Sequence, residues 1–487
     1  MTNLMKKNQH WFSILLGVVL ALAAFSFNPF ALKPDACKAV AVAVLMIVWW
    51  VTEALPMPVV ALVPLILHPL LKIGTIEEVS KSYSNPVVFL FLGGFLIGLA
   101  IEKWKLHKRI ALQIVKHTGT SGDRIILGFI IATGFISMWL SNTATTMMMF
   151  PIALSVIVVM KEHEKPGPGL HNFSLALMLV IAYASNIGGM ATIIGTPPNV
   201  AFIGIIEKKY GYTVQFLDWM IICTPLALIL LAALYIVLTK WMFPNRIKSS
   251  KEATTFIHQE IKGLGRLSVA EKRVLAVFLA TATLWITKDL FNGLKLFRLD
   301  DSMIALMGAL TLFAIPSGTT EEHKPKMLLT WEDTSRMAWG ILLLFGGGIA
   351  LAASLEKVGV MEQIGNWLAG FSHMGGFALV LMVVVISIFL SELMSNVAQV
   401  IVLAPVLAAL ADALHLDPLM LGLPMTLAAS AAAMMPMGTP PNAIVFSSGF
   451  IKLKDMLKAG FVMNLISIAV ISLFCWYVLP LVMSVLR

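Results

Sequence analysis

The sequence predicts an all-α polytopic membrane protein made of two inverted-topology repeats, each with a re-entrant hairpin and a broken helix. Three observations predict this fold class: the composition, the recurrence of apolar segments, and short strings that occur twice in the same order. Of 487 residues, 59% are hydrophobic and only 13% are charged, and the mean hydropathy is +0.88. A soluble fold with a solvated surface would be less apolar, so the bilayer is the main solvent of this chain.

Apolar segments long enough to enter or cross a bilayer recur along the whole chain. The first of them lie at 11–30, 39–55, 59–71 and 87–101. The segment at 11–30 follows two lysines, as a signal peptide would, but it does not end in a small-residue cleavage site. We therefore interpret it as a retained helix. The apolar segments leave no stretch for a soluble catalytic domain.

Charge, cysteines and motifs exclude several function classes. The net charge is +9, but the basic residues occupy short loops between apolar segments, which indicates membrane topology rather than nucleic-acid binding. Cys37, Cys223 and Cys475 are widely spaced, so neither a disulfide framework nor a zinc site is predicted. There is no His-Glu-x-x-His, no Gly-x-Ser-x-Gly and no paired intramembrane aspartates, which argues against an intramembrane enzyme.

Three strings occur twice in the chain. Gly93, Glu102 and Lys103 have counterparts 254 positions later. The pattern Ser-x-x-x-Ser-Asn at 137–142 recurs at 391–396 with the same offset, and Gly-Thr-Pro-Pro-Asn at 195–199 recurs at 438–442. Three matches in the same order predict that the chain consists of two homologous halves.

The repeat sets the expected domain boundaries. We expect a first repeat at 1–243, a cytoplasmic linker at 244–265 and a second repeat at 266–487. Each repeat should contain a hairpin, around 124–160 and 374–414, followed by a broken helix, around 171–206 and 418–450. With the amino terminus inside and hairpins that do not cross, most Lys and Arg residues fall on the cytoplasmic side. The second repeat then starts in the opposite sense, and inverted repeats are typical of secondary transporters.

The polar residues at the hairpins and proline pairs predict a binding site. A helix that breaks at Ser-Asn leaves free amide N–H groups and carbonyls, and the prolines of each Gly-Thr-Pro-Pro-Asn break the following helix. We expect four broken helices to converge, with helix N-termini that favour an anion and neutral oxygens that favour sodium. Glu392 is the one acid inside a hairpin. We interpret it as structural, with direct sodium ligation as the alternative.

These motifs resemble those of the divalent anion/sodium symporter (DASS) family, and the likeness extends over essentially the whole chain. The family signature is Ser-Asn-Thr in each of two re-entrant hairpins, found here at 141–143 and as the variant Ser-Asn-Val at 395–397. The resemblance implies a sodium-coupled symporter of small dicarboxylates such as succinate, malate and fumarate in the cell inner (plasma) membrane. It also implies a homodimer in which a scaffold domain dimerises and a transport domain moves as an elevator.

The same resemblance implies the residues of the site by position. The first sodium site would consist of Ser137, Ser141, Asn142 and the backbone of Gly195. The second would consist of Ser391, the backbone of Met394, Asn396 and the backbone of Gly438. The substrate carboxylates would contact the two motifs and the proline loops, at Asn142, Thr143, Thr196, Pro197, Asn396, Val397, Thr439 and Pro440.

Val397 departs from the family signature, because a valine replaces the threonine of the second motif and removes a hydroxyl donor. A valine also occurs there in some citrate-preferring members, so a tricarboxylate stays open as the substrate, as does sulfate. The sodium-independent exchangers of the family lack an intact second Ser-Asn pair. Both pairs are intact here, which favours symport over exchange. A channel is the remaining rival, and counterflow of a labelled dicarboxylate would separate a carrier from a pore.

Overall fold

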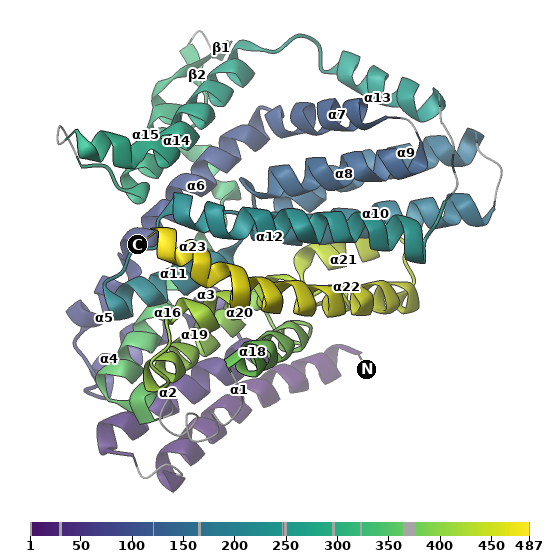
Figure 1. Cartoon of the computed structure of the whole chain (residues 1–487). Helices are drawn as coiled ribbons and strands as arrows, with labels where there is room; N and C mark the ends of the chain where they lie inside the picture. Colours follow the sequence, from purple (N-terminus) through teal and green to yellow (C-terminus); the bar gives the residue numbers. More distant parts are fainter. Residues whose placement is uncertain are drawn as a thin grey trace.

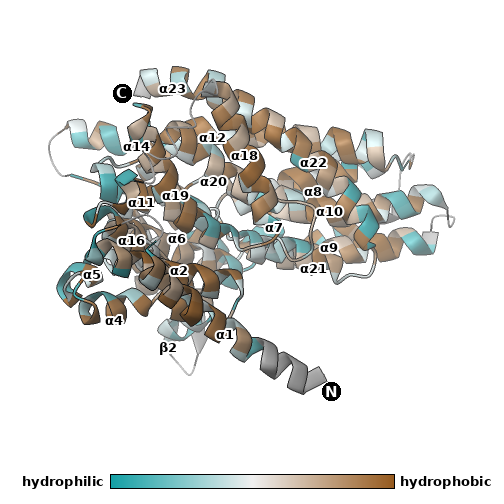
Figure 2. Cartoon of the chain, turned by 90° about the horizontal axis from the view of Figure 1, so that it is seen from below, coloured by the Kyte–Doolittle hydropathy of each residue, from teal (hydrophilic) through white to brown (hydrophobic). Residues whose placement is uncertain are grey.

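The computed structural model describes residues 2–28, 32–119, 121–163, 167–245, 247, 251–294, 298–321, 324–363 and 376–486. Within them the chain is almost entirely helical, and ten helices are long and apolar enough to cross a membrane. Figure 2 shows mainly hydrophobic helices, with hydrophilic residues gathered toward loops and helix ends. The prediction of an all-α, multi-span membrane protein is confirmed. The start of the expected second hairpin, at 374–375, lies outside the described residues.

The elements before the expected linker form a continuous series of helices. They are α1 (Thr2–Phe27), α2 (Pro34–Val51), α3 (Met57–Val60), α4 (Val63–Leu70), α5 (Ile76–Tyr83), α6 (Pro86–Lys103), α7 (Leu106–Thr118), α8 (Gly122–Ser137), α9 (Asn142–His163), α10 (Pro168–Gly189), α11 (Pro197–Tyr210), α12 (Phe216–Ile236) and the π-helix η1 (Val237–Met242).

The later elements include one small antiparallel hairpin of two strands. They are α13 (Lys251–Gly263), α14 (Val269–Gly293), α15 (Asp301–Ala314), β1 (Pro316–Glu321), β2 (Lys324–Met327), the 3-10 helix η2 (Trp331–Arg336), α16 (Trp339–Lys357), α18 (Gly376–Ser391), α19 (Asn396–Ala413), α20 (Leu419–Ser430), α21 (Pro440–Phe446), α22 (Leu453–Leu473), the π-helix η3 (Phe474–Val478) and α23 (Leu479–Leu486).

Local sequence signals explain several helix starts. Ser268 and Glu271 form a capping box at the start of α14, which pairs two backbone N–H groups that the helix itself cannot pair. Prolines stand in the first turn of α10, α11 and α21, where the missing N–H costs no helical hydrogen bond. The prolines of the two Gly-Thr-Pro-Pro-Asn strings therefore begin new helices, whereas the preceding helices α10 and α20 already end at Gly189 and Ser430.

The first hairpin packs closely against α10. Figure 1 shows α8, α9, α10, α12 and α22 running alongside one another, and α10 contacts α8, α9 and α12. A Cβ atom on Gly188 of α10 would lie 2.3 Å from the carbonyl oxygen of Gly134 of α8, so only glycine allows this approach. On another side of the molecule α6 packs against α15, and α16 packs against α5.

The last long helix of each expected half has the same construction. α12 and α22 are each 21 residues long, and each passes directly into a π-helix, η1 or η3. Their first residues, Phe216 and Leu453, are 237 positions apart, and so are the first residues of the two π-helices. The similarity of the halves thus extends to elements whose sequences share no obvious string. The repeat boundaries stay a prediction.

Candidate functional site

Four helix breaks face one cavity. Residues 138–141 separate α8 from α9, 190–196 separate α10 from α11, 392–395 separate α18 from α19, and 431–439 separate α20 from α21. Residues of all four breaks line a cavity of about 1570 Å³. The wall of this cavity therefore combines breaks that are far apart in the chain, from Ser141 to Thr439.

The structure places every predicted substrate residue on the wall of this cavity. They are Asn142, Thr143, Thr196, Pro197, Asn396, Val397, Thr439 and Pro440. Thr196 and Thr439 are buried, whereas Asn142, Asn396 and Val397 are half-buried. The two motifs and the two proline loops thus share one site, and their role as substrate contacts stays a prediction.

Ser137 and Asn142 form a polar cluster at the tip of the first hairpin. The Ser137 hydroxyl lies 2.9 Å from Asn142 Oδ1 and 2.7 Å from the carbonyl oxygen of Ser185. A hydroxyl carries one hydrogen, so it can donate to only one of these acceptors at a time. Donation to Ser185 leaves Asn142 Oδ1 available as a cation ligand. The backbone of Gly195 packs beside this cluster, since a Cβ atom there would lie 3.0 Å from the carbonyl oxygen of Ser137.

The second hairpin repeats this arrangement. The Ser391 hydroxyl lies 2.6 Å from Asn396 Oδ1 and 2.5 Å from the carbonyl oxygen of Ala429. The single hydroxyl hydrogen again has two possible acceptors, one of them the amide oxygen. Met394 and Gly438 of the predicted second sodium site line the cavity next to Asn396.

The donor set of both clusters suits sodium. Their oxygens belong to hydroxyls, side-chain amides and backbone carbonyls, which are hard and neutral ligands. No group of three or more His, Cys, Asp or Glu side chains that could hold a metal ion occurs in the described part of the chain. Such ligands suit a monovalent cation such as sodium.

The starts of helices supply the complementary polarity for an anion. The first residues of α9, α11 and α19, namely Asn142, Pro197 and Asn396, line the cavity. Helix N-termini carry partial positive charge and unpaired N–H groups, which favour a carboxylate. The predicted cation ligands Asn142 and Asn396 thus also stand at helix starts that favour an anion.

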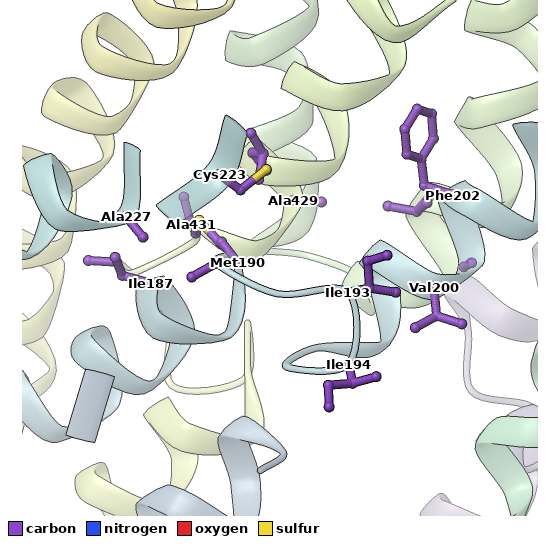
Figure 3. Close-up of a cluster of buried hydrophobic side chains, with 14 of the residues drawn as sticks. Ile187, Met190, Ile193, Ile194, Val200, Phe202, Cys223, Ala227, Ala429 and Ala431 are labelled. Atoms are coloured by element: carbon purple, nitrogen blue, oxygen red, sulfur yellow. The ribbon is translucent and has the colours of Figure 1, made fainter. Parts of the chain in front are cut away.

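Apolar side chains hold the break between α10 and α11 in place. Figure 3 shows Met190, Ile193 and Ile194 of this segment in a buried cluster that includes Cys223 and Ala227 of α12. Met190 and Ile193 are completely buried. This packing fixes the irregular backbone at membrane depth, and Thr196 at the end of the break lines the cavity.

The cavity extends to charged residues at the ends of α6, α7 and α13. Its lining includes Lys105, Lys108 and Glu260, and Lys108 Nζ lies 2.8 Å from Glu260 Oε2. These residues belong to the side that the distribution of Lys and Arg predicts to be cytoplasmic. In that orientation this part of the cavity wall would lie on the cytoplasmic side.

Glu392 holds the break between α20 and α21. Its carboxylate is buried and accepts hydrogen bonds from the backbone N–H groups of Ala433, Met434 and Met435 at 2.8–2.9 Å. It also accepts from Asn464 Nδ2 of α22 at 2.8 Å. These contacts agree with the structural interpretation of Glu392. The sequence did not indicate its partners, because they lie 41 to 72 positions away in the chain.

The equivalent break in the first half has no carboxylate. Met138 occupies the position 254 residues before Glu392, and its carbonyl oxygen accepts a hydrogen bond from the Thr192 hydroxyl. Thr192 Oγ1 in turn accepts from the backbone N–H of Gly195 at 3.0 Å. The breaks at 190–196 and 431–439 therefore occupy equivalent positions but are stabilised by different groups, the Thr192 hydroxyl in the first half and the Glu392 carboxylate in the second.

Sequence reasoning also missed Asn186. This residue of α10 is 3% exposed, lines the cavity, and contacts Asn142 and Thr439 through its side-chain amide. Asn186 follows Ser185 but belongs to none of the repeated strings, although an asparagine inside an apolar helix is itself a signal.

The chain is similar to a family of transporters over almost its whole length. A family model described as "Sodium:sulfate symporter transmembrane region" matches residues 7–484. The sodium-dependent dicarboxylate transporter SdcS of Staphylococcus saprophyticus is 39% identical over 478 residues, which cover 97% of this chain and 92% of the relative. SdcS of Staphylococcus aureus strain USA300 is 37% identical over 483 residues, with the same coverage.

Two solved structures are similar in fold at low sequence identity. The YdaH transporter of Alcanivorax borkumensis has a TM-score of 0.56 and 13% identity, covering 82% of this chain and 86% of that chain. MtrF of Neisseria gonorrhoeae, described with a class of antimetabolite efflux pumps, has a TM-score of 0.54 and 14% identity, covering 84% of each chain. At such identities the likeness concerns the fold alone.

Proposed function

The chain belongs to the family of the sodium:sulfate symporter transmembrane region, and we propose that it is a sodium-coupled symporter of small dicarboxylates such as succinate, malate and fumarate. It is a multi-pass protein of the plasma membrane. One observation carries the proposal: two equivalent Ser-Asn clusters, each with a helix N-terminus, face the same cavity.

Electrostatics explains why cations and dicarboxylate travel together. A dianion at membrane depth without countercharges costs free energy that helix N-termini alone do not offset. Sodium ions at the first cluster (Ser137, Ser141, Asn142, Gly195) and the second (Ser391, Met394, Asn396, Gly438) would compensate its two charges. Each cation makes the anion more stable in the site, and the anion does the same for the cations.

The movement proposed is an elevator, with alternating access from the two sides. The transport domain would comprise the two hairpins and the two broken helices, and the scaffold would comprise α2 to α6 and α14 to α16, with a second copy of the chain completing a homodimer. Contacts of α11 with α6 and α16, and of α19 with α16, form the surface along which the two parts would slide. The carrier makes and breaks no covalent bond of the substrate, so this function is not enzymatic.

Competition in proteoliposomes tests the substrate class. With sodium outside, unlabelled malate and fumarate should inhibit uptake of labelled succinate at concentrations similar to unlabelled succinate, and sulfate should inhibit only weakly. Citrate is the second candidate, favoured by Val397 on the cavity wall. Inhibition by sulfate alone would contradict the dicarboxylate assignment.

Val397→Thr should increase the affinity for succinate. Threonine is nearly isosteric with valine and adds a hydroxyl at the cavity wall. A hydrogen bond from this hydroxyl to a carboxylate contributes about 1.5–3 kcal/mol before desolvation, so we expect an affinity gain of about tenfold. Citrate, which is bulkier, should gain little or lose affinity.

Inhibition curves for succinate and citrate, measured at fixed sodium on wild type and Val397→Thr, check this result. Met147→Thr is a control, because Met147 lines the same cavity outside the predicted substrate contacts. If neither substrate responds to Val397→Thr, then Val397 does not contact the substrate.

A further inference from the structure

Asn186 connects the two halves of the site. Its Nδ2 atom lies 3.1 Å from Thr439 Oγ1 of the second proline loop, 253 positions away in the chain. Its Oδ1 atom lies 3.5 Å from Asn142 Nδ2 of the first hairpin. One buried amide therefore touches the first predicted cation cluster on one side and a predicted substrate contact of the opposite half on the other.

These contacts form a chain of hydrogen bonds with a fixed direction. Asn142 Oδ1 faces the Ser137 hydroxyl, and its Nδ2 faces Asn186 Oδ1 at 3.5 Å and Thr196 Oγ1 at 3.3 Å. Asn186 accepts at Oδ1 and donates from Nδ2 to Thr439. The Thr439 oxygen acts as an acceptor in this contact, so its own hydrogen stays available to another acceptor.

We propose that Asn186 is a positioning residue that couples cation binding at the Asn142 cluster to substrate binding at Thr439. The proposal rests on the proposed function and assigns a role within the same site. A cation on Asn142 Oδ1 fixes the orientation of that amide, because only the oxygen can ligate it. The amide then presents Nδ2 to Asn186, which holds its own Nδ2 toward Thr439.

The orientation of Asn186 affects substrate binding because it sets which hydrogen bonds the Thr439 hydroxyl can make. When Thr439 accepts from Asn186, its hydroxyl hydrogen can point into the cavity and donate to a carboxylate. Without the bond from Asn186, Thr439 Oγ1 keeps only the 3.3 Å hydrogen bond from the backbone N–H of Asn442, and its hydroxyl hydrogen can take other orientations. The first cation thus favours the orientation of Thr439 that binds the anion, although the two are carried by different halves of the chain.

Only the first half has an asparagine at this position. Ser185 and Ala429 have equivalent places, since each accepts from the serine of its own hairpin. The residue after Ser185 is Asn186, whereas the residue after Ala429 is Ser430. The Ser430 hydroxyl is buried and has no hydrogen-bond partner in the described part of the structure. Ser430→Ala is therefore a matched control at the equivalent position.

Calorimetric binding to the full-length protein in lipid nanodiscs tests the coupling. Succinate affinity is measured at low and at saturating sodium, with choline replacing sodium so that ionic strength stays constant. The ratio of the two dissociation constants is the coupling factor, and linkage requires succinate to change sodium affinity by the same factor. Both ratios are measured for wild type, Asn186→Ala, Asn186→Leu and Ser430→Ala.

We expect the coupling factor to fall about fivefold or more in both Asn186 variants and to stay at the wild-type value in Ser430→Ala. Leucine fills the space that alanine leaves open, so a shared effect reports the lost amide rather than a cavity. Wild-type coupling in either folded Asn186 variant, or an equal loss in Ser430→Ala, would overturn the role of Asn186. Absence of any sodium effect in wild type would instead overturn the proposed symport.

Discussion

Asn142→Ala should reduce sodium-driven succinate uptake by about 100-fold or more. The substitution removes an amide oxygen that is a predicted sodium ligand and an amide N–H group that bonds Thr196 and Asn186. Loss of one good ligand and of hydrogen bonds in a buried site amounts to about 3 kcal/mol, which corresponds to this factor. Asn396→Ala should have a similar effect, because Asn396 has the same relation to Ser391.

Uptake by purified variants in proteoliposomes measures this effect, and thermal unfolding in detergent shows that the variants fold. Asn172→Ala is a suitable control, because Asn172 lies on α10, does not line the cavity, and donates from Nδ2 to the carbonyl oxygen of Pro244. Wild-type uptake by Asn142→Ala would show that this asparagine binds neither cation nor substrate.

Glu392→Ala should destabilise the protein strongly and abolish transport. The carboxylate pairs three backbone N–H groups of the break between α20 and α21, and it also binds Asn464. Each buried N–H group left without a partner costs about 1–3 kcal/mol, so we expect a loss of about 3 kcal/mol or more in unfolding free energy. The loop also carries Gly438, so the second predicted sodium site should lose its geometry.

Glu392→Gln separates the loss of stability from the loss of transport. Glutamine keeps one acceptor oxygen but turns an NH2 group toward backbone donors, so its stability should lie between wild type and Glu392→Ala. Thermal unfolding and sodium-dependent uptake are measured together, with Glu356→Ala as the control because that carboxylate is exposed at the end of α16. An unchanged unfolding temperature in Glu392→Ala would contradict the supporting role of the carboxylate.

The sequence predicted those parts of the site that follow from local chemistry and repetition. The proline pairs and the Ser-Asn strings of the two hairpins predicted helix breaks, so Asn142, Asn396, Thr196 and Thr439 could be expected to line a site. The repeat indicated that these positions have equivalent surroundings. The structure then brings all of them to one cavity.

The parts that could not be predicted depend on contacts between distant segments. Asn186 belongs to no repeated string, and its importance comes from Thr439, 253 positions away. The partners of Glu392 are backbone groups, which have no signature in sequence. The π-helices after α12 and α22 are also decided by backbone hydrogen bonding rather than by a distinctive residue.

Uptake of labelled succinate into proteoliposomes, with either sodium or potassium outside, tests sodium-coupled dicarboxylate transport most directly. We expect accumulation only with sodium. Two sodium ions and one dianion carry no net charge, so a third sodium ion is needed before an inside-negative potential accelerates uptake, by about 2.3 kcal/mol per charge per 100 mV. Equal uptake with sodium and potassium outside would contradict sodium-coupled dicarboxylate transport.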